Sequence, residues 1–146
     1  MASGYWIRLL DGDDLVTYKS TIRMLYLAKC YKVSFVYGLI SKEKFTEYSR
    51  NFKYQKQSRA EGLAKFIRNC PANSSSILVS KKRFIYSGGC NENFISPDQV
   101  LFLRLFSKGP AVFLNQVVAK LPKDQSTDRL SSQIKRSRYE SILALI

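Results

Sequence analysis

The stretch from Tyr31 to Leu39, YKVSFVYGL, decides the fold class that the sequence predicts. From Tyr31 to Tyr37 every second side chain is apolar, and Lys32 and Ser34 lie between them. This period of two is typical of a half-buried β-strand, although Gly38 weakens its far end. The protein is therefore expected to contain a β-sheet.

Two short apolar runs precede this strand. Residues 5–10 and 15–18 flank Asp11-Gly12, and an Asp-Gly pair between such runs predicts a β-hairpin. The three carboxylates of residues 11–14 could instead hold magnesium or calcium. The spacing of a calcium loop is missing, however, and turn chemistry explains the pair without a metal. Residues 20–29 fit a helix or a strand equally well.

Helical and strand patterns alternate after Leu39. Ser41 can cap a helix that opens the basic stretch from residue 42, in which Phe45, Tyr48 and Phe52 share one face, and a second helical pattern covers residues 59–69. Residues 77–86 predict either one strand or a hairpin with the basic triplet of residues 81–83 at its tip.

The most apolar run is VLFLRLF, from Val100 to Phe106, and it predicts a central buried strand. Arg104 within that strand must reach a carboxylate or the surface. Pro110 favours the first turn of a helix over residues 111–121, with Phe113, Val117 and Leu121 on its inward stripe. Pro122 ends this helix.

Together these patterns predict an α+β fold, with a small antiparallel or mixed sheet packed with three to four helices in a single domain. A chain of 146 residues can bury about two-thirds of its unfolded surface. We expect residues 1–122 to form a basic core domain. Residues 123–146 are expected to form a linker and a carboxyl-terminal helix that packs on the core or on a partner.

Positive charge is the strongest indication of function. The chain carries 24 Lys and Arg against 11 Asp and Glu, and residues 42–83 hold 11 of these cations against three carboxylates. Such an excess favours an anionic partner. On a helix, the cations from residue 50 to residue 59 would form one positive edge. The predicted nucleic-acid-binding residues are Arg50, Lys53, Tyr54, Lys56, Arg59, Lys65, Arg68, Lys81, Lys82 and Arg83.

Aromatic rings between these cations allow two interpretations. The rings of Phe45, Tyr48, Phe52, Tyr54 and Phe66 can offer flat surfaces to nucleobases. They can instead pack into the core while the lysines solvate the outer face. The triplet of residues 81–83 can likewise be a solubilising edge.

Histidine is absent, and this excludes several kinds of active site. Ser-His-Asp and Cys-His nucleophiles, histidine general bases and mixed Cys/His zinc sites all need it. Pro97-Asp98 could begin a metal-dependent nuclease pattern, but no later carboxylate is followed two positions on by lysine. Gly88-Gly89 lacks the rest of a phosphate-binding loop. We therefore predict a non-enzymatic protein without a metal or another cofactor.

The cysteines and the amino terminus bear on localisation. Cys30, Cys70 and Cys90 form no C-x-x-C pair and predict reduced, buried thiols. The amino terminus lacks the pattern of a signal peptide, and no apolar run reaches the roughly 20 residues that span a bilayer. We expect a cytoplasmic or nuclear protein that is not secreted.

The carboxyl-terminal segment combines cations with an apolar end. It can pack on the core, bind a partner or second subunit, or lie on an anionic membrane. Its predicted contact residues are Arg136, Arg138, Ile142, Leu143 and Ile146.

The sequence favours binding to nucleic acid, and RNA or another single strand over duplex DNA. The residue runs of the common RNA-binding modules are absent, so the contacts are expected to be mainly with the phosphate backbone. The alternative is a peripheral membrane-binding or self-assembling structural protein, such as a viral matrix-like protein. Such a protein would bind anionic lipid and form homo-oligomers.

Overall fold

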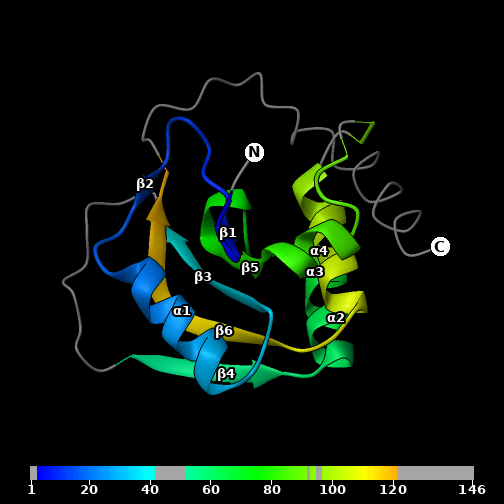
Figure 1. Cartoon of the computed structure of the whole chain (residues 1–146), viewed down its shortest axis with the longest axis horizontal. Helices are drawn as coiled ribbons and strands as arrows, with labels where there is room; N and C mark the ends of the chain where they lie inside the picture. Colours follow the sequence, from blue (N-terminus) through cyan, green and yellow to red (C-terminus); the bar gives the residue numbers. More distant parts are fainter. Residues whose placement is uncertain (1–2, 42–51, 92, 95–96, 122–146) are drawn as a thin grey trace.

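The structure is a computed structural model, and it describes residues 3–41, 52–91, 93–94 and 97–121. Within these residues a mixed sheet of six strands is packed with four α-helices, as Figure 1 shows. In chain order the elements are β1 (Trp6–Arg8), β2 (Leu15–Val16), α1 (Ser20–Cys30), β3 (Phe35–Ser41), β4 (Lys53–Gln57), α2 (Arg59–Arg68), the short 3-10 helix η1 (Ser74–Ser76), β5 (Ile77–Ser80), α3 (Lys81–Tyr86), α4 (Pro97–Ser107) and β6 (Ala111–Lys120).

The sheet has the strand order β1-β5-β3-β6-β2, and β4 also pairs with β6. Only β3 and β6 run parallel among the described pairs. β6 is long enough for β4 to pair with its first half and β2 with its last residues. The sheet is curled like half of a barrel. The α+β class is therefore confirmed, but the sheet is larger than the small sheet that we expected.

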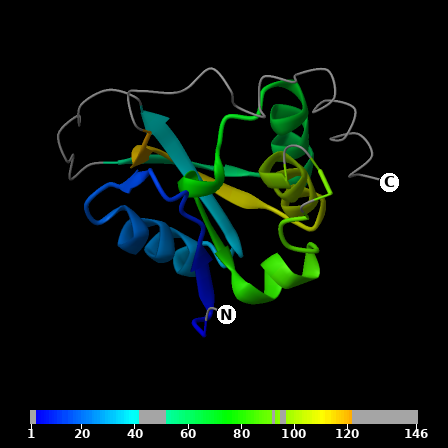
Figure 2. The same ribbon diagram turned by 90° about the horizontal axis from the view of Figure 1, so that it is seen from above.

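Helices cover the two faces of the sheet unequally. Figure 2 shows α1 on one side and α4 on the other, with α2 and α3 to either side of α4. Because strand side chains alternate, each central strand contributes to two cores. Phe35 and Tyr37 pack with α4, whereas Val36 packs with α1. We refer to these faces as the α4 side and the α1 side.

Residues 100–106 are helical in α4, so the prediction of a central strand was wrong. Six of the eleven residues of α4 are buried, and they lie on more than one face of the helix. A helix enclosed in this way produces a continuous apolar run that periodicity cannot distinguish from a buried strand. Arg104 is only half-buried, so it reaches the surface, and its guanidinium lies 5.6 Å from the centre of the Phe94 ring.

Residues 111–120 form β6, so the predicted helix was also wrong. The register of β6 against β3 shifts twice, next to Leu39. These irregularities interrupt the strict alternation that marks a strand. As a result, the apolar residues fell at intervals of four and imitated the stripe of a helix.

Three further predictions need correction. Residues 53–57 form the strand β4 rather than a helix. The basic triplet forms the first turn of α3. Ser80, the last residue of β5, is the N-cap of this helix, and its hydroxyl accepts a hydrogen bond from the Arg83 amide at 3.2 Å. The predicted hairpin does not form, since β1 pairs with β5 and β2 pairs with β6.

Other predictions agree with the structure. Residues 20–30, for which the sequence allowed a helix or a strand, form a helix. The strand predicted from Tyr31 is present from Phe35 onward. The helix predicted for residues 59–69 is α2, and a capping box begins it. The Ser58 amide donates to the Glu61 carboxylate at 2.8 Å, while the Glu61 amide donates to the Ser58 hydroxyl at 3.3 Å. Such reciprocal bonds satisfy amides that a helix start leaves free.

Candidate nucleic-acid interface

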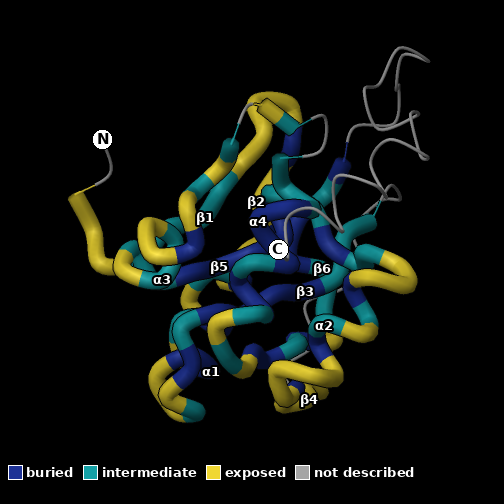
Figure 3. The backbone as a smooth tube through the Cα atoms, turned by 90° about the vertical axis from the view of Figure 1, so that its right-hand side faces the viewer, coloured by how far each residue is buried: buried dark blue, intermediate teal, exposed yellow. Residues whose placement is uncertain are grey.

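β4 carries the centre of the predicted binding site on the outside of the sheet. Among the described strands it pairs with β6 alone, from Lys53 opposite Asn115 to Gln57 opposite Ala111. Its first four residues are exposed, and Figure 3 shows β4 as exposed beside the buried central strands. Two lysines and a tyrosine are therefore accessible at this edge.

The alternation of β4 separates its two lysines. Gln57 points to the α4 side, where its side-chain oxygen accepts a hydrogen bond from the buried Tyr37 hydroxyl at 2.7 Å. Lys53 shares that direction, two pleats away. Phe52 packs against the core of the α1 side, and Tyr54 and Lys56 follow it at intervals of two. The single positive edge expected from a helix is thus replaced by cations on both faces of an edge strand.

Tyr54 and Lys56 meet Tyr31 at the end of α1. The Lys56 ammonium lies 4.3 Å from the centre of the Tyr31 ring, a distance that permits a cation–π interaction. The centres of the Tyr31 and Tyr54 rings lie 5.1 Å apart, and the Tyr31 hydroxyl donates a hydrogen bond to the Tyr54 hydroxyl. This bond is the main reason why the pKa of Tyr31 is raised to about 12.

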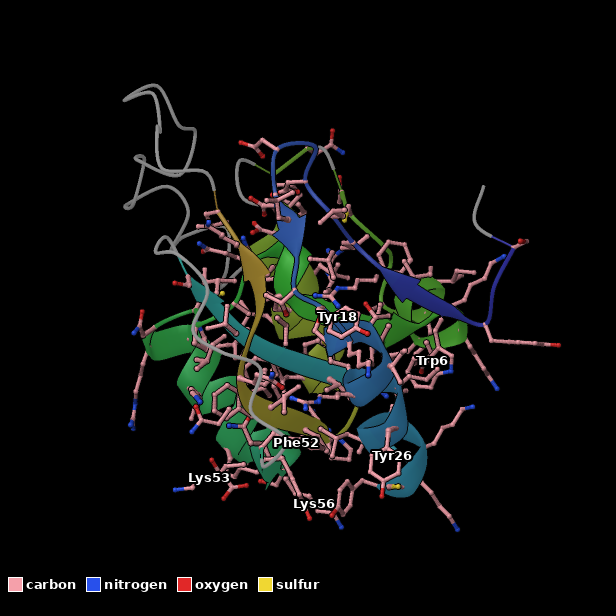
Figure 4. All side chains as sticks on the ribbon, turned by 90° about the vertical axis from the view of Figure 1, so that its left-hand side faces the viewer. Trp6, Tyr18, Tyr26, Phe52, Lys53 and Lys56 are labelled. Carbon is pink, nitrogen blue, oxygen red and sulfur yellow. The ribbon has the colours of Figure 1, made fainter. Side chains whose placement is uncertain are left out.

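Tyr26 extends this group along α1. The hydrogen bond between its hydroxyl and the Cys30 thiol is the main cause that raises the pKa of Tyr26, and the nearby Tyr54 hydroxyl also contributes. Tyr26, Tyr31, Tyr54 and Lys56 therefore form one group, which we call the tyrosine face. Figure 4 shows Tyr26 on α1 on the same side of the molecule as Lys56.

Sequence reasoning missed the contribution of α1 to this surface. Ile22 and Tyr26 lie four residues apart on the outward side of α1, Tyr18 lies just before the helix, and all three are exposed. Lys29 and Lys32, at the end of the helix, are exposed as well. The helix itself contains no acidic residue. The spacing of Ile22 and Tyr26 was a readable signal of an exposed helix face, but residues 20–29 had not been assigned to a helix.

The predicted residues of α2 differ in accessibility. Arg59 and Arg68 are exposed at the two ends of the helix. Lys65 is half-buried, with its ammonium 4.4 Å from the centre of the Phe113 ring and 5.7 Å from that of Tyr37. Lys65 thus packs over the aromatic core, whereas Arg59 stands next to the end of β4.

The basic triplet lies elsewhere. α3 follows β5, and β3 and β6 separate β5 from β4, a span of roughly 14 Å at the spacing of neighbouring strands. Arg83 donates to the Leu105 carbonyl at 2.7 Å and so ties α3 to α4, and its burial lowers the pKa of the guanidinium. Lys82 is exposed, as is Tyr86, whose ring lies 5.2 Å from the Lys108 ammonium. The predicted residues therefore lie in two groups rather than in one continuous patch.

Several predicted residues lie outside the described part of the chain. They are Arg50, with the part of the expected helix that covers residues 42–51, and the carboxyl-terminal contacts Arg136, Arg138, Ile142, Leu143 and Ile146. Their roles stay predictions.

The structure also shows the environment of the three cysteine thiols and of the Asp98 carboxylate. Cys30 and Cys90 are exposed and Cys70 is half-buried, so the prediction of three buried thiols was wrong for two of them; all three are free. Burial is the main cause that raises the pKa of Asp98, in the first turn of α4. Across the ranges that the structure covers, no three Cys, Asp or Glu side chains are grouped closely enough to hold a metal ion.

No family of proteins matches the chain, and no curated protein matches it. None of the helices within the described ranges has the length and apolar character needed to cross a membrane.

Proposed function

We propose that this protein binds single-stranded nucleic acid without catalysing a reaction, and that RNA is the preferred polymer. Lys53, Lys56 and Arg59, on and beside the edge strand β4, would supply the main phosphate contacts. The observation that carries the proposal is the tyrosine face, where the Lys56 ammonium lies 4.3 Å from the centre of a tyrosine ring, next to further exposed rings. Proteins that bind single strands combine cations for the backbone with aromatic rings for the bases.

The form of this surface favours a single strand over a duplex. A sequence-reading duplex binder commonly inserts a helix with polar and basic side chains into the major groove. Instead, Tyr18 just before α1 and Ile22 and Tyr26 on its outward side are 71%, 68% and 60% exposed. The two tyrosine rings suit unpaired bases, which expose their faces.

The test is a fluorescence-anisotropy titration with an oligouridylate of about 12 nucleotides. Three phosphate contacts to a single strand predict a slope of about −2 for log affinity against log salt, which is about a 15-fold loss from about 50 to about 200 mM. A flat salt response would contradict the proposal.

Variants locate the contacts. The triple variant loses three phosphate contacts through Lys53→Gln, Lys56→Gln and Arg59→Gln. It should bind the oligouridylate more weakly, and the magnitude of its salt slope should fall by about 2. The melting temperature should change little, since Lys53, Lys56 and Arg59 are all exposed. The matched control, Lys82→Gln with Lys108→Gln and Lys120→Gln, removes the same charge away from β4. An equal loss in both variants would mean that net charge alone, rather than this surface, binds the polymer.

The alternative is peripheral binding to an anionic membrane. One observation favours it: Ile85 and Tyr86 of α3 are 64% and 71% exposed, close to Lys82 and Lys108. Flotation with phosphatidylserine vesicles at the same salt separates the two functions. Vesicle binding without oligouridylate binding would replace our proposal with this one.

A further inference from the structure

The tyrosine face has features that phosphate binding alone does not require. Tyr26 and Tyr54 are 60% and 46% exposed, whereas the nearby core residue Tyr37 is fully buried. Large aromatic rings usually become buried on folding, because each removes much apolar surface from water. Two exposed rings and a half-buried one in a single group therefore form an apolar surface that a partner can cover.

Two rings of this group are held together by their polar ends. The Tyr31 hydroxyl is bonded to that of Tyr54, and the two ring centres lie 5.1 Å apart. Since these two hydroxyls bond to each other, the partner need not satisfy them, and the flat faces are left for contact. Rings that are already oriented lose little conformational entropy when a ligand binds.

The charges around the rings fit a polyanion. Lys56 lies over one ring, and Lys29 and Lys32 are exposed near the end of α1 where Tyr31 follows. Phenols are neutral at physiological pH, since even an unperturbed tyrosine ionises only near pH 10, so these rings do not repel phosphate. Neutral rings flanked by ammonium groups match the alternation of base and phosphate along a single strand.

We propose that the tyrosine face is a base-stacking site, at which Tyr26 and Tyr54 each stack on an unpaired nucleobase while Lys56 binds the adjoining phosphate. Tyr31 is a positioning residue, because its hydrogen bond orients Tyr54. This inference rests on the proposed binding of single strands and adds how an unpaired strand is distinguished from a duplex. In a duplex the faces of the bases are stacked on each other and closed to these rings.

The experiment compares an oligouridylate of about 12 nucleotides with an RNA duplex of similar length. Tyr26→Ala and Tyr54→Ala should each weaken oligouridylate binding by about 5- to 100-fold, the range that loss of one base–aromatic stack produces. Neither should change duplex binding by more than about twofold. Tyr26→Phe keeps the ring and should retain the affinity of the unmodified protein.

Tyr86→Ala is the matched control, because Tyr86 is a 71% exposed tyrosine on α3, away from this face. It should leave oligouridylate binding unchanged. Melting temperatures of all variants test that they are folded.

The outcomes separate the two proposals. If the unmodified protein binds oligouridylate with the expected salt slope but Tyr26→Ala and Tyr54→Ala bind equally well, stacking is wrong and phosphate binding stands. If both variants weaken duplex and single-strand binding alike, the rings contribute only to the shape of the surface, and stacking is again wrong. If the unmodified protein binds neither probe, the proposed function itself fails.

Discussion

Arg8 joins four parts of the fold. It donates hydrogen bonds to Ser20 and Thr21 of α1, to the Val118 carbonyl of β6 at 2.7 Å, and to the Ser75 carbonyl of η1 at 3.3 Å. Burial lowers its pKa to about 10, so it is charged at neutral pH. Arg8 therefore serves the interior, and its charge is not part of a binding surface.

The cationic side chains of this protein therefore have different roles. Lys56 lies at an exposed edge, whereas Lys65 packs over core rings and Arg83 bonds to a main-chain carbonyl. A net charge of +13 consequently overstates what a partner meets. Only burial distinguishes a structural cation from one that is available to phosphate.

Cys70 gives a prediction for the dependence of stability on pH. Burial of this thiol, which donates weakly to the Ala72 carbonyl at 3.5 Å, raises its pKa from an ordinary 9.0 to about 12. Its contribution to stability is therefore complete below about pH 9 and is lost as the pH rises towards 12. Between those values the free energy of unfolding should fall by up to about 1.4 kcal/mol per pH unit from this group.

Urea denaturation at pH 8 to 10.5 measures this slope, roughly the range over which a free thiol ionises. Cys70→Ala should lower the slope. Equal slopes in the unmodified protein and in Cys70→Ala would contradict the assignment to Cys70.

At the scale of elements, the packing of α2 on α4 depends on one glycine. A Cβ atom built on Gly62 would lie 1.9 Å from Cε1 of Phe106, much closer than two carbon atoms can approach. A glycine inside a helix costs about 1 kcal/mol relative to alanine, so its presence in α2 needs a reason. Close approach of the two helices is that reason.

Gly62→Ala should therefore destabilise the protein by about 1–3 kcal/mol, despite the better helix propensity of alanine. The free energy of unfolding in urea is the measurement. Ala64→Ser, at an exposed position of the same helix, should change it by about 0.5 kcal/mol or less. A Gly62→Ala protein as stable as the unmodified one would show that Phe106 moves aside without cost.

At the scale of the whole molecule, the sheet divides the positive charge. One group of predicted cations lies on β4 and at the start of α2, and the other on α3, with β3 and β6 between their strands. An extended single strand could follow one group but would have to cross the sheet to reach the other. This arrangement is why the proposed site is limited to the surroundings of β4.

The predicted domain boundary can be tested with a chain that ends at Pro122. β6, which pairs with β2, β3 and β4, ends at Lys120, and the Leu121 amide bonds to the Ser41 carbonyl at 2.9 Å. This chain should unfold in one cooperative transition, as single domains of its size do. Circular dichroism during heating is the measurement.

A chain that stops before β6 is the control and should not fold, because β3, β4 and β2 all pair with β6. A broad, non-cooperative transition of the chain ending at Pro122 would show that residues from 123 onward complete the core.

The sequence by itself determined the α+β class, the helix over residues 59–69 and a strand within residues 31–39, because their periodicities are local; the structure has that strand at Phe35–Ser41. The capping box of Ser58 and Glu61 was equally readable. Only the tertiary structure decided that residues 97–107 are a helix and 111–120 a strand. Residues 97–107 are buried on more than one face, which removes the polar positions by which a period is recognised, and in residues 111–120 the register shifts interrupt the alternation. The tyrosine face likewise needed the tertiary structure, since Tyr31 and Tyr54 meet through the pairing of β4 with β6 and the packing of α1 on the sheet, contacts between segments far apart in the chain.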